Sequence, residues 1–418
     1  MKRFNGASFI GKLVTVCALL WTNGVEAQSE QPSVENGAED ENLPVAGYDK
    51  GFFIQDPKGL FKLVVGSTMQ PHFAWESVEE HVEEIDDATG ETVVLKRTDR
   101  EPEYAFMIRR AELKLKGHAF HENVTYGFMA DFAKGTVGLK DYYLDFALAP
   151  KVFHMRFGSY KKPFSRQQIT SSSKLELVDR SITDKAFGQG RDLGIMFHNK
   201  FDKSPTFEWA VGVFNGTGEK PWFEGKLEED DAGEIDGISS RSKYTNVPDR
   251  FHPLAVARLG FNHGDLKGYS EADLEGGPFR FGLGVSGIVD FDSDDDDDSN
   301  IRGELDFIIK AAGFSTTGGV YVMTAQDGGG MGDQSFNSWG LHAQAGYVIK
   351  EMVQPAFRYA LVDLDGDFDR TQELTGGLAV YIFGHNLKWQ TDFGGRIYEH
   401  EMGDLTDYVV RSQVSLAF

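Results

Sequence analysis

Apolar and polar residues alternate along most of this chain with a period of two. Between residues 61 and 75 most of the large apolar side chains fall on odd positions, while lysine, threonine, glutamine and histidine fall on even ones. The same alternation recurs at 124–132, 305–310 and 387–397. Successive side chains of a β-strand point to opposite faces, so the pattern predicts strands with one apolar and one polar face rather than helices.

The connections between such segments also alternate in length. Those after even-numbered segments are mostly very short, whereas those after odd-numbered segments include 76–102, 161–190 and 215–252. The connection 264–278 is too long for this scheme and could hide a missed strand boundary. Sixteen segments are predicted, at 59–75, 103–117, 121–133, 139–149, 151–160, 191–199, 206–214, 253–263, 279–290, 301–311, 313–325, 337–349, 352–362, 372–384, 386–399 and 406–418.

This pattern predicts an all-β fold, a transmembrane antiparallel β-barrel of about 16 strands over residues 59–418. In lipid every backbone polar group must be paired within the protein, so such a sheet must close. We expect long external loops on one rim and short periplasmic turns on the other. Both ends of the barrel should lie on the short-turn rim.

Residues 1–27 have the pattern of a secretory signal peptide. Two basic residues supply the positive start, an apolar run covers 9–21, and small residues precede a cleavage point before Gln28. The run is too short to cross a bilayer as a helix, and an uncleaved amphipathic anchor is the alternative. Residues 28–58 read as a flexible acidic lead without a folded domain.

Charge and cysteine content narrow the possible functions. The formal net charge is −23, and because residues 1–27 carry three bases and one acid, the remainder has −25. This balance argues against a nucleic-acid partner, which needs a basic face. The single cysteine, Cys17, lies inside the expected signal, so the mature chain would have no disulfide, thiolate metal site or cysteine nucleophile. We expect no cofactor.

The last predicted strand indicates a location. Tyr408, Val410, Val414 and Leu416 alternate with polar or small residues, and the pattern ends on Phe418. A final strand that stops on phenylalanine resembles the C-terminal signal of bacterial outer-membrane barrels. We therefore expect export to the cell outer membrane of a Gram-negative bacterium, with outer-membrane lipid in contact with the apolar face.

Several motifs in the first half of the predicted barrel resemble one family. They are RRAELKLKG at 109–117, RFGSYKKPFS at 156–165, LVDRS at 177–181, RDLG at 191–194 and WAVGVFNG at 209–216. These stretches are similar to motifs of the phosphate-selective porin O and P family. The resemblance implies a sixteen-stranded, homotrimeric porin whose third external loop folds into the lumen and narrows it. Since only a few members of the family select phosphate, the resemblance makes phosphate one candidate among small anionic solutes.

Residues 161–190 are the third external loop in this segmentation, and their charge sets them apart. They hold six bases against three acids, whereas 76–102 holds three bases against ten acids. A basic loop inside a pore would attract anions and narrow the passage. Alternatively, the bases could pair with nearby carboxylates and only hold the loop down.

A second candidate feature is a one-residue phase shift in the apolar face of segment 103–117. It predicts a β-bulge at Arg109-Arg110, which could turn an arginine into the pore or mark a rim. We expect the pore constriction and solute-binding site to comprise Lys161, Lys162, Arg166, Arg156, Arg180, Lys174, Arg109 and Arg110.

Aspartates gather in two other loops, 291–300 and 363–371. Solvated external loops explain them, although divalent-cation binding is an alternative because hard oxygen ligands suit calcium. Segment 363–371 begins like an EF-hand loop but has neither its closing glutamate nor flanking helices. We therefore predict no metal site.

Together these patterns favour an outer-membrane porin for small solutes, with anions preferred and phosphate among the candidates. A general or cation-preferring porin is the nearest alternative. A non-conducting adhesin or structural barrel, and an outer-membrane enzyme, come from other classes. The enzyme has little support, because no Gly-x-Ser-x-Gly, Cys-His pair or His-Glu-x-x-His occurs.

Overall fold

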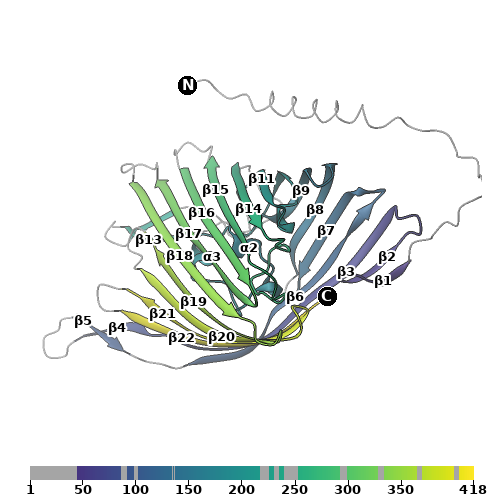
Figure 1. Ribbon diagram of the computed structural model, residues 1–418. Coiled ribbons are helices and arrows are strands. Elements are labelled where there is room, and N and C mark those ends of the chain that lie inside the picture. The colour runs from purple at the N-terminus through teal and green to yellow at the C-terminus, as the bar shows by residue number, and fades with distance from the viewer. Residues whose placement is uncertain are drawn as a thin grey trace, which may run out of the picture. The chain divides into compact units, whose positions relative to one another are not determined.

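The chain forms a closed antiparallel β-barrel of sixteen strands (Figure 1). The computed structural model describes residues 45–85, 92–97, 102–133, 135, 137–216, 226–229, 235–239, 253–291, 299–327, 334–364, 370–399 and 404–418. The barrel strands are β3 (Phe61–Ser77), β6 (Glu103–Ala119), β7 (His121–Asp131), β8 (Gly138–Ala149), β9 (Phe153–Lys161), β10 (Arg191–His198), β11 (Phe207–Phe214), β14 (Leu254–His263), β15 (Arg280–Phe291), β16 (Ser299–Ala311), β17 (Phe314–Asp327), β18 (Gln334–Tyr347), β19 (Val353–Asp363), β20 (Thr371–Phe383), β21 (Leu387–Tyr398) and β22 (Leu405–Ala417).

The ring closes where the last strand meets the first. Each barrel strand pairs with its neighbour along the chain, and β22 pairs with β3 in a register that sets Tyr408 opposite Ser77 and Ala417 opposite Thr68. Closure leaves no open edge in the ring, as a sheet surrounded by lipid requires. All sixteen predicted segments coincide with these strands to within a few residues, so the predicted fold class is confirmed.

Side chains alternate between the two faces of the wall. In β15, Leu283 and Val285 lie about half exposed on the outer face, whereas Ser286 and Arg280 are buried on the inner face. The same alternation in the other strands produces an apolar exterior and a polar interior. Among the described residues, no helix has the length and apolar character needed to cross a bilayer.

Part of the expected acidic lead is ordered as strands. Strands β1 (Ala46–Tyr48) and β2 (Phe52–Gln55) form a hairpin, and β2 pairs with residues 62–65 of β3. The hairpin occupies the part of the β3 edge that β22 leaves unpaired, which satisfies backbone groups there. Residues 1–44, including the predicted signal peptide, lie outside the described part of the chain.

The long connections carry further elements. Two hairpins stand apart from the barrel sheet, one made of β4 (Glu80–Ile85) and β5 (Thr92–Arg97), the other of β12 (Lys226–Glu229) and β13 (Ile235–Ser239). A single 3-10 turn, η2 (Phe201–Lys203), lies in the β10–β11 connection. The connection between β9 and β10 contains α2 (Arg166–Ile169), a 3-10 turn η1 (Ser172–Lys174) and α3 (Ile182–Ala186). Figure 1 shows α2 and α3 within the ring of strands.

The connection 264–279 contains no missed barrel strand. It turns inward, where Tyr269 donates to Glu208 at 2.7 Å and the carbonyl of Ala272 accepts from Lys310 at 2.8 Å. An inward path explains why this connection is longer than the other turns on its rim. Of the aspartate runs, residues 292–298 and 365–369 lie outside the described residues, and Asp363 pairs with Arg370 at 3.0 Å.

Candidate functional site

The loop 162–190 packs against the inner wall through apolar side chains. Phe164, Leu175, Leu177, Val178 and Phe187 are each 2% exposed or less, and the Phe187 ring stacks on Tyr321 of β17 with centroids 5.4 Å apart. A loop in open water would not bury five large apolar side chains. This apolar anchor therefore holds the loop inside the barrel.

Two bases of the loop hold it to the wall by buried ion pairs. Lys162 lies 3.2 Å from Asp192 of β10, and Arg166 lies 2.6 Å from Asp306 of β16. Asp306 also accepts from Arg258 at 2.7 Å, so one carboxylate serves two guanidinium groups. For Lys162 and Arg166 these contacts match the structural alternative raised by the sequence, in which loop bases pair with carboxylates.

Lys161 and Arg180 bind backbone carbonyls of the same loop. The Lys161 ammonium donates to the carbonyls of residues 168, 169 and 170, where α2 ends, and Arg180 donates to those of residues 167 and 170. Cations at a helix C-terminus satisfy carbonyls that lack a partner within the helix. Lys174 is half-buried, and no hydrogen bond of its side chain to another described residue is present.

The predicted bulge in β6 is present and turns arginines into the lumen. The register of β3 and β6 shifts between Gln70 and Pro71, which leaves Arg109 as the extra residue. Arg109 donates to both carboxylate oxygens of Asp179 in the loop, at 3.1 and 3.2 Å, and Arg110 donates to Gln70 at 2.8 Å. The bulge therefore turns two adjacent arginines inward, and Arg109 contacts the loop.

Arg156 of β9 also faces inward, as its alternation with Phe157 predicts. Its guanidinium lies 2.8 Å from Asp145 and 4.4 Å from the centroid of the Tyr143 ring. His154 and His198 bind the same carboxylate, each at 2.9 Å. Arg156 is thus held in a buried cluster on the inner wall.

Two inward bases of β6 were not among the site residues predicted from the sequence. Lys114 and Lys116 follow Arg110 on β6, and the outward Leu113 and Leu115 alternate with them. Lys114 contacts Glu112 at 2.9 Å and Thr68 of β3 at 2.5 Å. The alternation within RRAELKLKG could have identified both lysines, since they share the parity of Arg110.

Exposure separates the inner wall into two regions. Arg258, Arg358 and Lys388, on β14, β19 and β21, are 1% exposed or less, and they contact the inward loop or the connection 264–279. On β6 the Arg109 and Lys114 side chains are 39% and 21% exposed. Solvent therefore reaches the interior along β6, and the bases of that strand line it.

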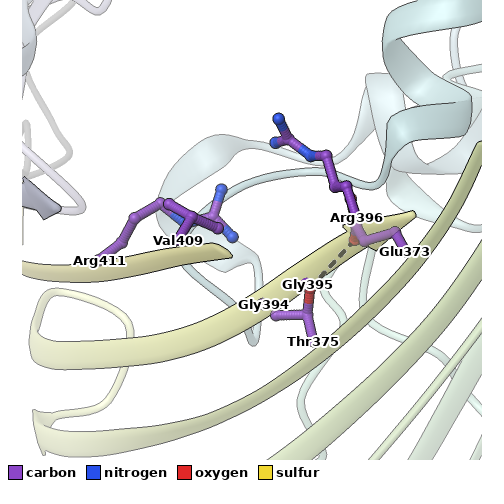
Figure 2. A pocket seen from close by; sticks show the side chains of 7 residues that line it. All are labelled: Glu373, Thr375, Gly394, Gly395, Arg396, Val409 and Arg411. Atoms are coloured by element: carbon purple, nitrogen blue, oxygen red, sulfur yellow. Dashed lines mark hydrogen bonds between the residues drawn. The ribbon is translucent and has the colours of Figure 1, made fainter. Parts of the chain in front are cut away.

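A shallow polar notch lies on the wall formed by β20, β21 and β22 (Figure 2). Arg396 and Arg411 line it together with Glu373. The Glu373 carboxylate forms an ion pair with Arg358 at 2.6 Å. Arg411 also lies 3.6 Å from Asp179, so Asp179 faces arginines from β6 and β22. Burial alone would raise the pKa of Asp179, but the guanidinium groups of Arg109 and Arg411 lower it below its ordinary value.

The shared carboxylate of Asp306 provides a test of how the loop is held. We predict that Asp306→Ala lowers the free energy of unfolding by about 3–5 kcal/mol, because it leaves two buried guanidinium groups without their partner. Asp49→Ala is the control. The Asp49 side chain is 65% exposed and its ion pair with Lys62 is long, at 3.9 Å, so this substitution should lower the free energy of unfolding by less than about 1 kcal/mol. Urea unfolding of the protein in lipid vesicles measures both. Equal costs for the two variants would contradict the prediction.

Comparisons with known proteins agree with this geometry. An anion-selective porin from Comamonas acidovorans superposes with a TM-score of 0.50 and 11% identity, over 86% of this chain and 100% of that one. The outer-membrane channel DcaP of Acinetobacter baumannii superposes with a TM-score of 0.53 and 12% identity, over 87% and 99%. At such identities the likeness shows the fold alone. No curated protein sequence matches the chain.

The family match is independent of these superpositions. The family model described as phosphate-selective porin O and P matches residues 94–416, which is most of the chain. It covers β6 with its bulge, the inward loop and all later strands of the barrel. The chain is a β-barrel porin of the outer membrane and belongs to the phosphate-selective porin O and P family.

Proposed function

We propose that this porin passes small anions along the inner face of β6. The observation that carries the proposal is the run of inward bases Arg109, Arg110, Lys114 and Lys116 on one strand, which solvent reaches. Glu112 is the one acid in that run, and Lys114 pairs with it. Bases repeated along a strand offer an anion successive sites, each weak enough to leave.

In this proposal the loop 162–190 narrows the lumen, and its bases have two roles. Lys162 and Arg166 hold the loop in place through buried ion pairs, and Lys161 of β9 binds its carbonyls, while Arg180 and Lys174 of the loop are only half-buried. Narrowing brings the passing ion close to the β6 bases. Attraction at a partly desolvated constriction is stronger than in open water, so a few inward bases can outweigh many external acids. Screening at physiological salt acts over about 8 Å, which limits the reach of those acids.

Reversal potentials under a salt gradient test the anion preference. We predict that the wild type prefers chloride over potassium, and that Lys114→Glu with Lys116→Glu removes or reverses the preference. The matched control is Lys151→Glu with Lys350→Glu, which makes the same charge change at exposed positions in two short turns. Cation preference in the wild type, or equal shifts in both double variants, would support a general or cation-preferring porin instead.

Phosphate is the anion that we propose to be preferred. The support is the family description, together with the adjacent arginines of the bulge, because guanidinium groups bind phosphate oxygens in a bidentate manner. We predict that inorganic phosphate inhibits chloride current, and that Arg110→Lys raises the half-inhibiting concentration several-fold. Arg370→Lys, at an exposed position beside Asp363, is the control and should leave inhibition unchanged. Sulfate and phosphate inhibiting equally would refute phosphate preference.

We also propose that the porin is a homotrimer and that residues 1–27 are a cleaved export signal. The trimer follows from the family resemblance. Light scattering in mild detergent should give about three times the mass of the chain, because trimeric porins stay associated under such conditions. A mass equal to one chain would contradict the trimer. Family and fold indicate a channel rather than an enzyme.

A further inference from the structure

Two segments, the loop 162–190 and the connection 264–279, enter the lumen from opposite rims of the barrel and contact each other. The external loop 162–190 touches the periplasmic connection 264–279 at two backbone groups. The N–H of Glu271 donates to the carbonyl of Lys174 at 3.2 Å, and the N–H of Glu176 donates to the Glu271 carboxylate at 2.8 Å. The side-chain amide of Gln344 on the barrel wall also joins them.

Two buried carboxyl groups lie at this contact. Glu176 and Glu271 are 2% and 4% exposed, and the amide nitrogen of Gln344 on β18 donates to both, at 2.8 and 3.0 Å. Glu176 accepts further from Gln354 at 2.6 Å and from Ser315. The other Glu271 oxygen, Oε1, is buried and has no hydrogen-bond partner among the residues that the structure describes.

Charged groups from every neighbouring element surround the pair. Two wall lysines bind backbone carbonyls beside it, Lys388 that of Leu175 at 2.6 Å and Lys310 that of Ala272 at 2.8 Å. Their positive charges moderate the repulsion between the carboxylates. Asp273 and Glu275 also face the pair, and both form ion pairs with Arg280. Arg358 lies 3.5 Å from the side-chain oxygen of Gln344. The other two facing groups are Tyr381, which donates to Gln354, and His385, which is hydrogen-bonded to Ser270.

We propose that Glu176 and Glu271 form a latch between the external loop and the periplasmic connection, closed while Glu176 carries a proton and weakened when both carboxyl groups are ionised. Release would let the loop 162–190 and the connection 264–279 separate, which would widen the lumen. The proposal rests on the porin function proposed above, since it concerns the width of that same lumen. The shared donor supports it, because both buried carboxylates accept from the Gln344 amide nitrogen, which brings two like charges close together.

The direction of the pH response follows from linkage. Burial and the neighbouring Glu271 carboxylate raise the pKa of Glu176 to about 7, against 4.5 for the ordinary group. Between these values the latched state binds a proton that the released state does not. Rising pH therefore weakens the latch by up to about tenfold per unit within that window, and no further above it.

Conductance of the full-length protein in planar bilayers, measured from pH 5 to pH 8.5, tests the latch. We expect conductance, or the fraction of time in a larger open state, to rise towards pH 7 and then level off. Glu271→Gln removes the neighbouring negative charge, so it should make the pH response smaller and keep the conductance nearer the low-pH level. The glutamine keeps an oxygen that accepts from Gln344 and cannot ionise.

The matched control is Glu275→Gln, in the same connection but 43% exposed, which should retain the wild-type response. A conducting wild type without pH dependence, or a Glu271→Gln variant with the wild-type profile, would overturn the latch and leave the porin function standing. Absence of conductance at every pH would instead overturn the porin function.

Thiol labelling gives a second readout that does not depend on other titrating groups in the pore. A Ser173→Cys variant, with Cys17→Ala, places a thiol at a position that is 8% exposed in the loop. Its labelling rate is compared with that in the Glu271→Gln background, which cancels the pH dependence of the thiolate itself. We expect the ratio of the two rates to rise several-fold from pH 5.5 to pH 8. A constant ratio would contradict the latch.

Discussion

Pairing of every backbone N–H and C=O within the wall is the constraint on which this structure depends. A sheet in lipid has no water to satisfy an open edge, so the first and last strands must meet, as β3 and β22 do. Closure decides which face of each strand is inside. It thereby converts a period-two sequence pattern into an apolar exterior and a polar lumen.

A closed ring of sixteen strands is wide, and this chain fills much of it with its own segments. The loop 162–190 inserts apolar side chains and bases, and the connection 264–279 meets it from the opposite rim. Several of the charged groups that this buries form ion pairs, as Arg166 does with Asp306. Removing one partner of such a pair is costly, whereas the pair itself contributes little net stability.

The bases of the lumen consequently fall into two groups with different roles. Lys162, Arg166 and Arg258 are buried with carboxylates and hold the inner segments in place. Arg109 and Lys114, on β6, remain partly exposed. A base is available to a passing anion only where solvent also reaches it. The proposed path therefore follows β6, although the loop between β9 and β10 has the more conspicuous charge.

The sequence alone determined the strands, their number, the parity of their connections and the bulge at Arg109, because each of these is a local pattern of side-chain size and polarity. The same local rule could have identified Lys114 and Lys116. The tertiary structure alone decided which loop bases are structural, because Arg166 meets Asp306 across 140 positions of sequence once the barrel has closed. It also decided that 264–279 turns inward, since no local pattern marks the contact of Glu271 with Glu176. Alternation reports the face of a strand, but the partner of an inward charge depends on which strands and loops the closed ring brings together.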